Sequence, residues 1–461
     1  MEPLIKAVAA IEGTSKDDTD IAGNTQEQHL RLPVPDIGRP IHRSLTAPLA
    51  VGPNPEPNEI RHDDKYDNPL DSSSRWYLSA RAKALRQGAK IGFGMQHRMS
   101  PSPPDPTKTI YLDSTLGGSI GKEIIQVDVW VPECRKMRHF HRSQKPVRPA
   151  VINFHGGGFV LGQGTDDARW AVAAMTTMDA VVFSVNYRLA PSHPFPKPVE
   201  DCVDAIMQIC CPEGPIAKTF NLDPNRIFLS GFSAGGNLAL AAWLILASRN
   251  KWAEWGYANM PACTPRISGI ALFYPLLDWT VSRPRKRASC SRPDQTLPSS
   301  MTDLFDASYI YPPLPVHKRT DWRLSPGLMS DEMINHLPPM HLCLCEFDML
   351  LTEGLTFAER LRHQHKSVEV RIVEGAKHAW DKPPGIIPKG SMAVEYAAAL
   401  KSIETWSAEL DRIEAEEGTD TDAPEKVDVG QHMKLVEIAP QERQQQLLKP
   451  HEYMTRAITN V

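Results

Sequence analysis

The stretch FLSGFSAGGNLAL (residues 228–240) joins an apolar, strand-like run to a helix-forming run through Gly-Phe-Ser-Ala-Gly-Gly. Glycine tolerates backbone dihedrals that other residues avoid, so a sharp strand-to-helix turn alone explains the glycines. The order Gly-x-Ser-x-Gly allows a second interpretation, in which Gly231 and Gly235 hold Ser233 on a strained turn as an exposed nucleophile. The stretch predicts a strand, a turn and a helix, and other parts of the chain must decide between the two interpretations.

Strand-like and helix-like runs alternate around this stretch. Runs that are apolar throughout are typical of parallel strands covered on both faces, and alternation with helices indicates right-handed βαβ crossovers. The sequence therefore predicts an α/β fold with an eight-stranded, mostly parallel, doubly wound sheet. The expected strands are 109–115, 123–132, 149–155, 180–188, 226–231, 267–275, 340–346 and 368–375. The expected helices of the core are 166–178, 199–210, 234–249, 353–365 and 390–409.

Composition divides the chain of 461 residues into five parts. Prolines crowd the first hundred residues and the 280–340 region, which we expect to be irregular or built of short pieces. A helix over 72–90 has a basic face, either solvated while the helix packs on the core or lying on a membrane. The run RPRKR (283–287) is expected to be a solvated loop, with a targeting signal as the alternative. The expected parts are an N-terminal extension with a cap helix (1–105), a core in two pieces (106–279 and 339–409), a cap insert (280–338) and a mobile tail (410–461).

Bulk properties exclude several classes of protein. The net charge of −4 gives no basic excess for nucleic acid. No run of about 18 apolar residues predicts a membrane span, and the first twenty residues lack a charged lead-in followed by a cleavable core. The 8 cysteines do not form a disulfide framework, and neither HExxH nor a His/Cys cluster suggests a metal. We expect a cytoplasmic protein without a metal or cofactor, and the sequence leaves a homo-oligomer open.

The stretch NFHGGGFVLG (153–162) ends the third expected strand with three consecutive glycines. Glycines lose much entropy on ordering, but they let backbone N–H groups approach a reacting atom. A plain flexible turn is the alternative. We expect the N–H groups of Gly156, Gly157 and Ala234 to surround an oxyanion, with Gly158 completing the loop and His155 bracing it.

A serine nucleophile needs a base and an acid. The α/β-hydrolase order is nucleophile, acid, histidine. Asp348 follows the seventh expected strand and His378 follows the eighth, and both positions lie where a doubly wound sheet assembles its sites. The competing acids are Glu346 and Glu353, expected on the solvated rim of the Asp348 loop, and Asp381, which follows His378 too closely to orient it.

Six motifs then make the chain resemble the hormone-sensitive lipase family of α/β-hydrolases, which includes arylacetamide deacetylase-like proteins and bacterial carboxylesterases. They are HGGGF, NYRLAPSHPFP, DPNRIFLSGFSAGGNLAL, YPLLD, FDMLLTEG and KHAW, in this order between about 148 and 382. The resemblance implies Ser233, Asp348 and His378 as a catalytic triad and a cap over the site. Two positions depart from the family: Phe232 stands where an acidic residue commonly precedes the nucleophile, and Ser192 where Glu is common.

These observations predict a serine hydrolase that cleaves small or medium acyl esters through an acyl-enzyme. Two alternatives remain open: a non-catalytic ligand-binding protein on the same fold, and an amide or lactone hydrolase. Aromatic residues of the cap either roof a pocket or pack in the cap's own core. They are Trp76, Trp279, Phe305, Tyr309, Tyr311 and Trp322.

Overall fold

The computed structural model describes residues 68–99, 102–116, 123–133, 146–257, 260, 264–382 and 390–419. Contacts divide the chain into two units, Met1–Leu410 and Asp411–Val461. The described residues of the second unit are the last turns of one helix. The expected extension before residue 68 and the expected tail after 419 lie outside the described residues. Among the described helices, none combines the length and the apolarity that crossing a bilayer requires.

An eight-stranded sheet forms the centre of the first unit, in the order β1-β2-β4-β3-β5-β6-β7-β8. The first strand pairs antiparallel with the second, and the second pairs antiparallel with β4; the other pairs are parallel. The predicted α/β fold with a mostly parallel sheet is therefore confirmed. The strands are β1 (Lys108–Asp113), β2 (Ile124–Trp130), β3 (Arg148–Phe154), β4 (Val181–Asn186), β5 (Leu222–Phe232), β6 (Gly269–Phe273), β7 (Met340–Phe347) and β8 (Val368–Lys377).

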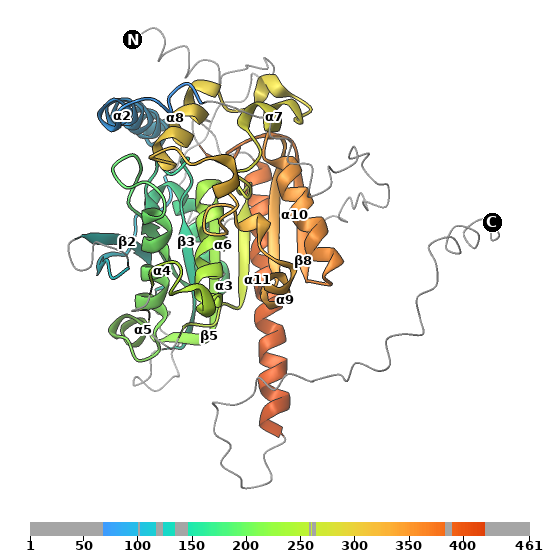
Figure 1. Ribbon diagram of the computed structural model, residues 1–461. Helices are drawn as coiled ribbons and strands as arrows, with labels where there is room; N and C mark the ends of the chain where they lie inside the picture. Colours follow the sequence, from blue (N-terminus) through green and yellow to red (C-terminus); the bar gives the residue numbers. More distant parts are fainter. Residues whose placement is uncertain are drawn as a thin grey trace, which may run out of the picture. The chain divides into compact units, whose positions relative to one another are not determined.

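Helices cover both faces of the sheet (Figure 1). Neighbouring residues of one strand point to opposite faces, so Leu229 packs with one helix layer and Phe228 with the other. The first layer contains α4 (Lys197–Cys210), α6 (Ala234–Ala247) and α10 (Leu351–His363), and the second contains α3 (Ala168–Met178) and the part of α11 (Gly390–Thr419) up to residue 410. Helix α11 continues past its expected end at 409. Short helices α5 (Pro215–Phe220) and α9 (Asp331–His336) complete the core connections.

Helix α6, which follows Ser233, is buried on all sides. Its residues from Ala234 to Leu246 are all buried, and a helix that is apolar all round is stable only inside a protein. Burying one large apolar side chain contributes about 1.5–3 kcal/mol. The helix that follows Ser233 is therefore a rigid central element.

Three helices lie together at one end of the sheet: α2 (Arg75–Met99), α7 (Arg283–Ala288) and α8 (Ser299–Tyr309) (Figure 1). Leu78 of α2 packs against Leu304 and Ala307 of α8. Helix α2 continues beyond its expected end at residue 90. The prediction that the run RPRKR is a solvated loop is wrong. The run forms α7, and Lys286 of this helix is buried.

Candidate active site

The turn between β5 and α6 holds Ser233 in a strained conformation, with φ 52° and ψ −115°. Positive φ is costly for a residue with a side chain. The flanking glycines are required by space, because a Cβ on Gly235 would lie 1.9 Å from the Phe154 backbone oxygen and one on Gly231 would lie 2.3 Å from the Gly235 oxygen. Glycine at both positions thus allows the close approach that points the serine out of the turn.

Two hydrogen bonds connect Ser233, His378 and Asp348. With the imidazole proton on Nδ1, Ser233 Oγ donates to His378 Nε2 over 2.8 Å, and His378 Nδ1 donates to Asp348 Oδ2 over 2.6 Å. Asp348 is almost fully buried, and its Oδ1 accepts from the Leu350 N–H over 3.1 Å. Parallel strands β5, β7 and β8 end at the same edge of the sheet, so residues far apart in sequence meet there.

The competing carboxylates lie elsewhere. Glu346 accepts from the Gly375 N–H over 2.7 Å. Asp381 accepts from the hydroxyls of Tyr274 and Tyr396 over 2.5 and 2.6 Å. Glu353, expected on a solvated rim, is instead buried and ion-paired with Lys286. Of the four carboxylates considered, Asp348 is the one hydrogen-bonded to His378.

The glycine loop after β3 lies against the Ser233 turn. A Cβ on Gly156 would lie 3.1 Å from the Phe232 backbone oxygen and 3.5 Å from Ser233 Cβ. Gly157 and Gly158 have positive φ values of 113° and 59°, which glycine adopts without strain. Ala234 is the first residue of α6, and the first N–H groups of a helix have no partner within it. The glycine loop and the first residue of α6 therefore both lie beside Ser233.

The side chain of His155 is packed at the start of this loop. Its ring is buried, stacks on Tyr187 with centroids 4.2 Å apart, and its Nδ1 lies 2.8 Å from the Gly156 oxygen. Burial lowers the pKa of His155, which favours a neutral ring. The Tyr187 hydroxyl donates to the His155 oxygen over 2.7 Å, so the ring and the backbone of this residue are both fixed.

Phe232, at the position where the resembled family has an acid, is fully buried and faces a cation. Its ring stacks on Phe273 with centroids 4.4 Å apart, and Lys382 Nζ lies 3.6 Å from its centroid. Lys382 also pairs with Asp167 over 2.7 Å and with Asp381 over 3.0 Å. The ammonium thus connects the segment after the glycine loop, the residue before Ser233 and the loop that carries His378.

Sequence reasoning missed this buried charge cluster. Two charged pairs in the sequence could have indicated this cluster. Asp-Asp at 166–167 follows the glycine loop, and Asp-Lys at 381–382 follows His378. Both loops were assigned to the same edge of the sheet. Burial, together with the neighbouring Asp167, raises the pKa of Asp166 to about 7.

A cavity of about 600 Å³ opens above Ser233 and His378. Its polar side is formed by Gln163, Asp166 and Lys382, and α2 contributes Arg86 and Lys90. The apolar side comes from the insert and from the loops after β6 and β7, through Leu276, Leu297, Met301, Phe305, Met349 and Leu350. A volume of this order is typical of small-molecule sites.

Of the six cap aromatics expected to roof a pocket or pack in a core, Phe305 lines the cavity. Trp279 and Tyr309 are buried beside Phe159, so core packing describes them better. Tyr311 and Trp322 pack at the edges of the core clusters, and Trp76 is 78% exposed. In the described ranges, no group of three or more His, Cys, Asp or Glu side chains is arranged to hold a metal ion.

Known proteins share this fold and parts of this sequence. A family described as alpha/beta hydrolase fold matches residues 151–382. Carboxylesterase NlhH of Mycobacterium tuberculosis is 29% identical over 315 residues, which cover 66% of this chain and 86% of that protein. Arylacetamide deacetylase of Bos taurus is 27% identical over 323 residues, covering 61% and 77%. An esterase structure from Pyrobaculum calidifontis covers 72% of this chain and 97% of its own, with 24% identity and a TM-score of 0.55, a likeness of fold.

Proposed function

This chain belongs to the α/β-hydrolase family, as its motifs predicted, and from that premise we propose that it is a serine esterase acting through an acyl-enzyme. The relatives named carboxylesterase and arylacetamide deacetylase support ester cleavage as the reaction class. Ser233, His378 and Asp348 are the proposed nucleophile, base and acid.

The observation that carries the proposal is the unbroken hydrogen-bond chain from Ser233 Oγ through the imidazole to Asp348. A serine hydroxyl is a weak nucleophile until a base removes its proton, and the base must be oriented by a third group. All three requirements meet at one point on the cavity wall, because Ser233, His378 and Asp348 all line the cavity.

The proposed reaction has two halves. Ser233 Oγ attacks the ester carbonyl while His378 Nε2 takes its proton, and the N–H groups of Gly156, Gly157 and Ala234 hold the developing oxyanion. His378 then gives the proton to the leaving alkoxide, which departs and leaves an acyl-serine. Water then attacks the acyl-serine while His378 Nε2 takes a proton from it, and His378 gives that proton to Ser233 Oγ as the carboxylic acid leaves.

The cavity supports short-to-medium acyl groups. Its volume of about 600 Å³ is that of a small-molecule site. The roof is packed in place, because Phe305 of α8 contacts the Gly158 region. In general, a roof that excludes water strengthens the contacts to an oxyanion.

A non-catalytic binding protein on the same fold would not need the imidazole bridge, whereas here it is complete. An amide or lactone hydrolase would use the same atoms, so its distinction from an esterase is one of substrate preference.

Burst kinetics with p-nitrophenyl acetate test the proposal. An acyl-enzyme releases one equivalent of p-nitrophenol per site rapidly, followed by slower steady turnover. Ser233→Ala should lose the burst and about 10⁶ of turnover, with the far-UV circular dichroism spectrum unchanged. A burst that survives in Ser233→Ala, or a folded wild-type protein that releases no nitrophenol, would contradict the proposed mechanism.

A further inference from the structure

Helix α7 of the insert places two cations in the interior of the protein. The Lys286 side chain is 4% exposed and the Arg283 side chain 11% exposed. Burying a charge is costly unless it is paired and hydrogen-bonded. The partners of these two side chains therefore show which segments α7 connects.

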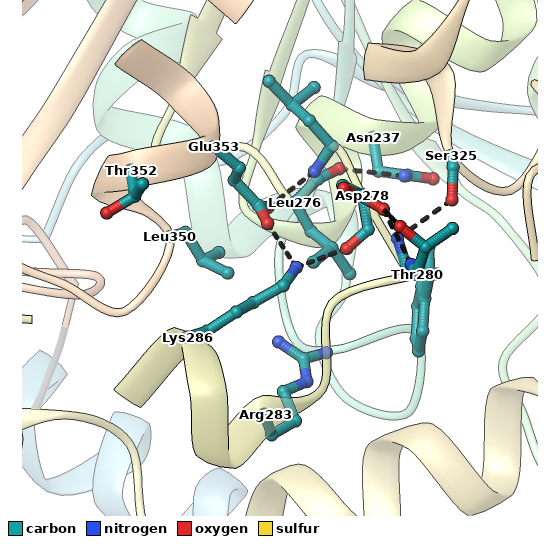
Figure 2. A network of polar contacts seen from close by, with 12 residues as sticks. Asn237, Leu276, Asp278, Thr280, Arg283, Lys286, Ser325, Leu350, Thr352 and Glu353 are labelled. Atoms are coloured by element: carbon teal, nitrogen blue, oxygen red, sulfur yellow. Dashed lines mark hydrogen bonds and ion pairs between the residues drawn. The ribbon is translucent and has the colours of Figure 1, made fainter. Parts of the chain in front are cut away.

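Lys286 reaches across to the loop after β6 and to helix α10. Its Nζ is ion-paired with Glu353 Oε2 and donates to the backbone oxygen of Asp278 (Figure 2). Glu353 Oε1 accepts from the Leu277 N–H over 2.8 Å. Thr352 also donates to Ser289, just after α7, over 3.2 Å. Three separate segments are joined at this buried pair.

Glu353 lies in the first turn of α10, and that turn also fixes Asp348. The Leu350 N–H donates to Asp348 Oδ1 over 3.1 Å, and the Leu351 N–H donates to the Asp348 backbone oxygen over 3.1 Å. A shift of this turn would move the carboxylate that His378 Nδ1 contacts. We propose that Lys286 and Glu353 are positioning residues, and that their ion pair holds Asp348 in place against His378.

Arg283 extends the same connection to the roof of the cavity. Two of its guanidinium nitrogens donate to the Asp306 carboxylate of α8, and the shortest of the three contacts is 2.7 Å. The neighbouring Phe305 covers Gly158 of the glycine loop. The insert is thus part of the scaffold of both the acid and the oxyanion loop, in addition to covering the cavity. This inference rests on the proposed function, since it gives Asp348 the role of acid.

A purely structural ion pair would stabilise the protein without acting through Asp348, and a double-mutant cycle separates the two cases. The main variant is Lys286→Met with Glu353→Leu, which removes both charges and leaves neither buried alone. We expect kcat for p-nitrophenyl butyrate to fall between about 10- and 100-fold, because a misplacement of about 1 Å can cost roughly 100-fold. KM should change little.

The same pair of substitutions in an Asp348→Asn background should cause no further loss of kcat. The matched control is Arg371→Met with Glu395→Leu, which removes another partly buried pair, between β8 and α11, and should leave kcat within about twofold of wild type. Equal losses of kcat in both backgrounds, or wild-type kcat in the folded double variant, would overturn the inference.

Two further measurements keep the test decisive. If the double variant does not fold, Glu353→Gln keeps the acceptor for Leu277 and loses the charge, and wild-type kcat in that variant would also overturn the inference. The second is the low-field proton NMR signal of the His378 N–H that donates to Asp348. It should be present in wild type, absent in Asp348→Asn, and shifted or lost in the Lys286/Glu353 variant but not in the control. Because this signal needs no ester turnover, it tests the inference even if the proposed esterase activity fails; an unshifted signal would refute it.

Discussion

The ammonium of Lys382 lies 3.6 Å from the centre of the ring of Phe232, the residue that precedes Ser233. An aromatic face attracts a cation by about 2 kcal/mol when both are desolvated. Lys382 is also ion-paired with Asp167 and Asp381. At this site a lysine from the loop that carries His378 therefore contacts Phe232, which stands where an acid is common in the resembled family.

Lys382→Met should destabilise the protein severely. Two carboxylates would lose their buried cation, and breaking a buried pair in this way costs about 3–5 kcal/mol. Urea unfolding followed by circular dichroism measures the free energy of unfolding. Lys382→Arg, which keeps the charge, should lose less. A Lys382→Met protein as stable as wild type would show that the cluster contributes nothing to the fold.

Asp348→Asn should lower kcat by roughly 10⁴, because an asparagine favours the wrong imidazole tautomer. Asp381→Asn is the matched comparison, since Asp381 bonds to two tyrosines and Lys382 rather than to His378. It should lower the melting temperature with a much smaller effect on kcat. Steady-state kinetics on both variants measures the two losses of kcat. A larger loss in Asp381→Asn than in Asp348→Asn would identify Asp381 as the acid.

Gly158→Ala should impair both stability and turnover. The added Cβ would lie 2.2 Å from Phe305 Cδ2 at a φ of 59°, so the loop or the roof must move. We expect the free energy of unfolding to fall by about 1–3 kcal/mol and kcat to be reduced. Adding Phe305→Ala should restore part of the kcat by removing the collision. If the second substitution restores nothing, strain at φ alone explains the loss.

Asp166 makes stability depend on pH. Its pKa rises from 3.8 to about 7 in the folded protein, so between these values the unfolded chain binds fewer protons and stability falls as pH rises. Asp166→Asn keeps the acceptor for the Gln163 N–H and should flatten this decline, with a gain of at most a few kcal/mol above pH 7. Urea unfolding at pH 4.5, 6 and 8 measures it, with the exposed Asp113→Asn as the control. Parallel pH profiles for wild type and Asp166→Asn would contradict the assignment.

The ratio kcat/KM should peak at short or medium acyl chains across p-nitrophenyl esters from acetate to palmitate. The cavity volume of about 600 Å³ limits the length of the acyl chain that it accepts. Leu297→Ala and Met301→Ala, which both enlarge the apolar side, should move the peak to longer chains. A steady rise to palmitate, or a jump in rate above the solubility limit of the ester, would contradict this description of the cavity.

The fold class could be predicted from local sequence patterns because these patterns depend only on neighbouring residues. Apolar strands alternating with helices, and glycines around Ser233, require only backbone sterics and burial, and both are encoded residue by residue. Chain order and strand ends then placed Asp348 and His378 at the same edge as Ser233, where the structure has them hydrogen-bonded. The sequence by itself therefore determined the fold class, the strained serine turn and the residues that meet beside it.

Contacts between segments distant in sequence were decided only by the tertiary structure. Nothing local in RPRKR marks Lys286 for burial; a basic run looks solvated until a carboxylate from another segment, here Glu353, compensates its desolvation. The same holds for Lys382, because two of its partners, Asp167 and Phe232, lie more than 100 residues away in the chain. Charge burial depends on which partner is present at a distance of about 3 Å, and that distance exists only once the chain has folded.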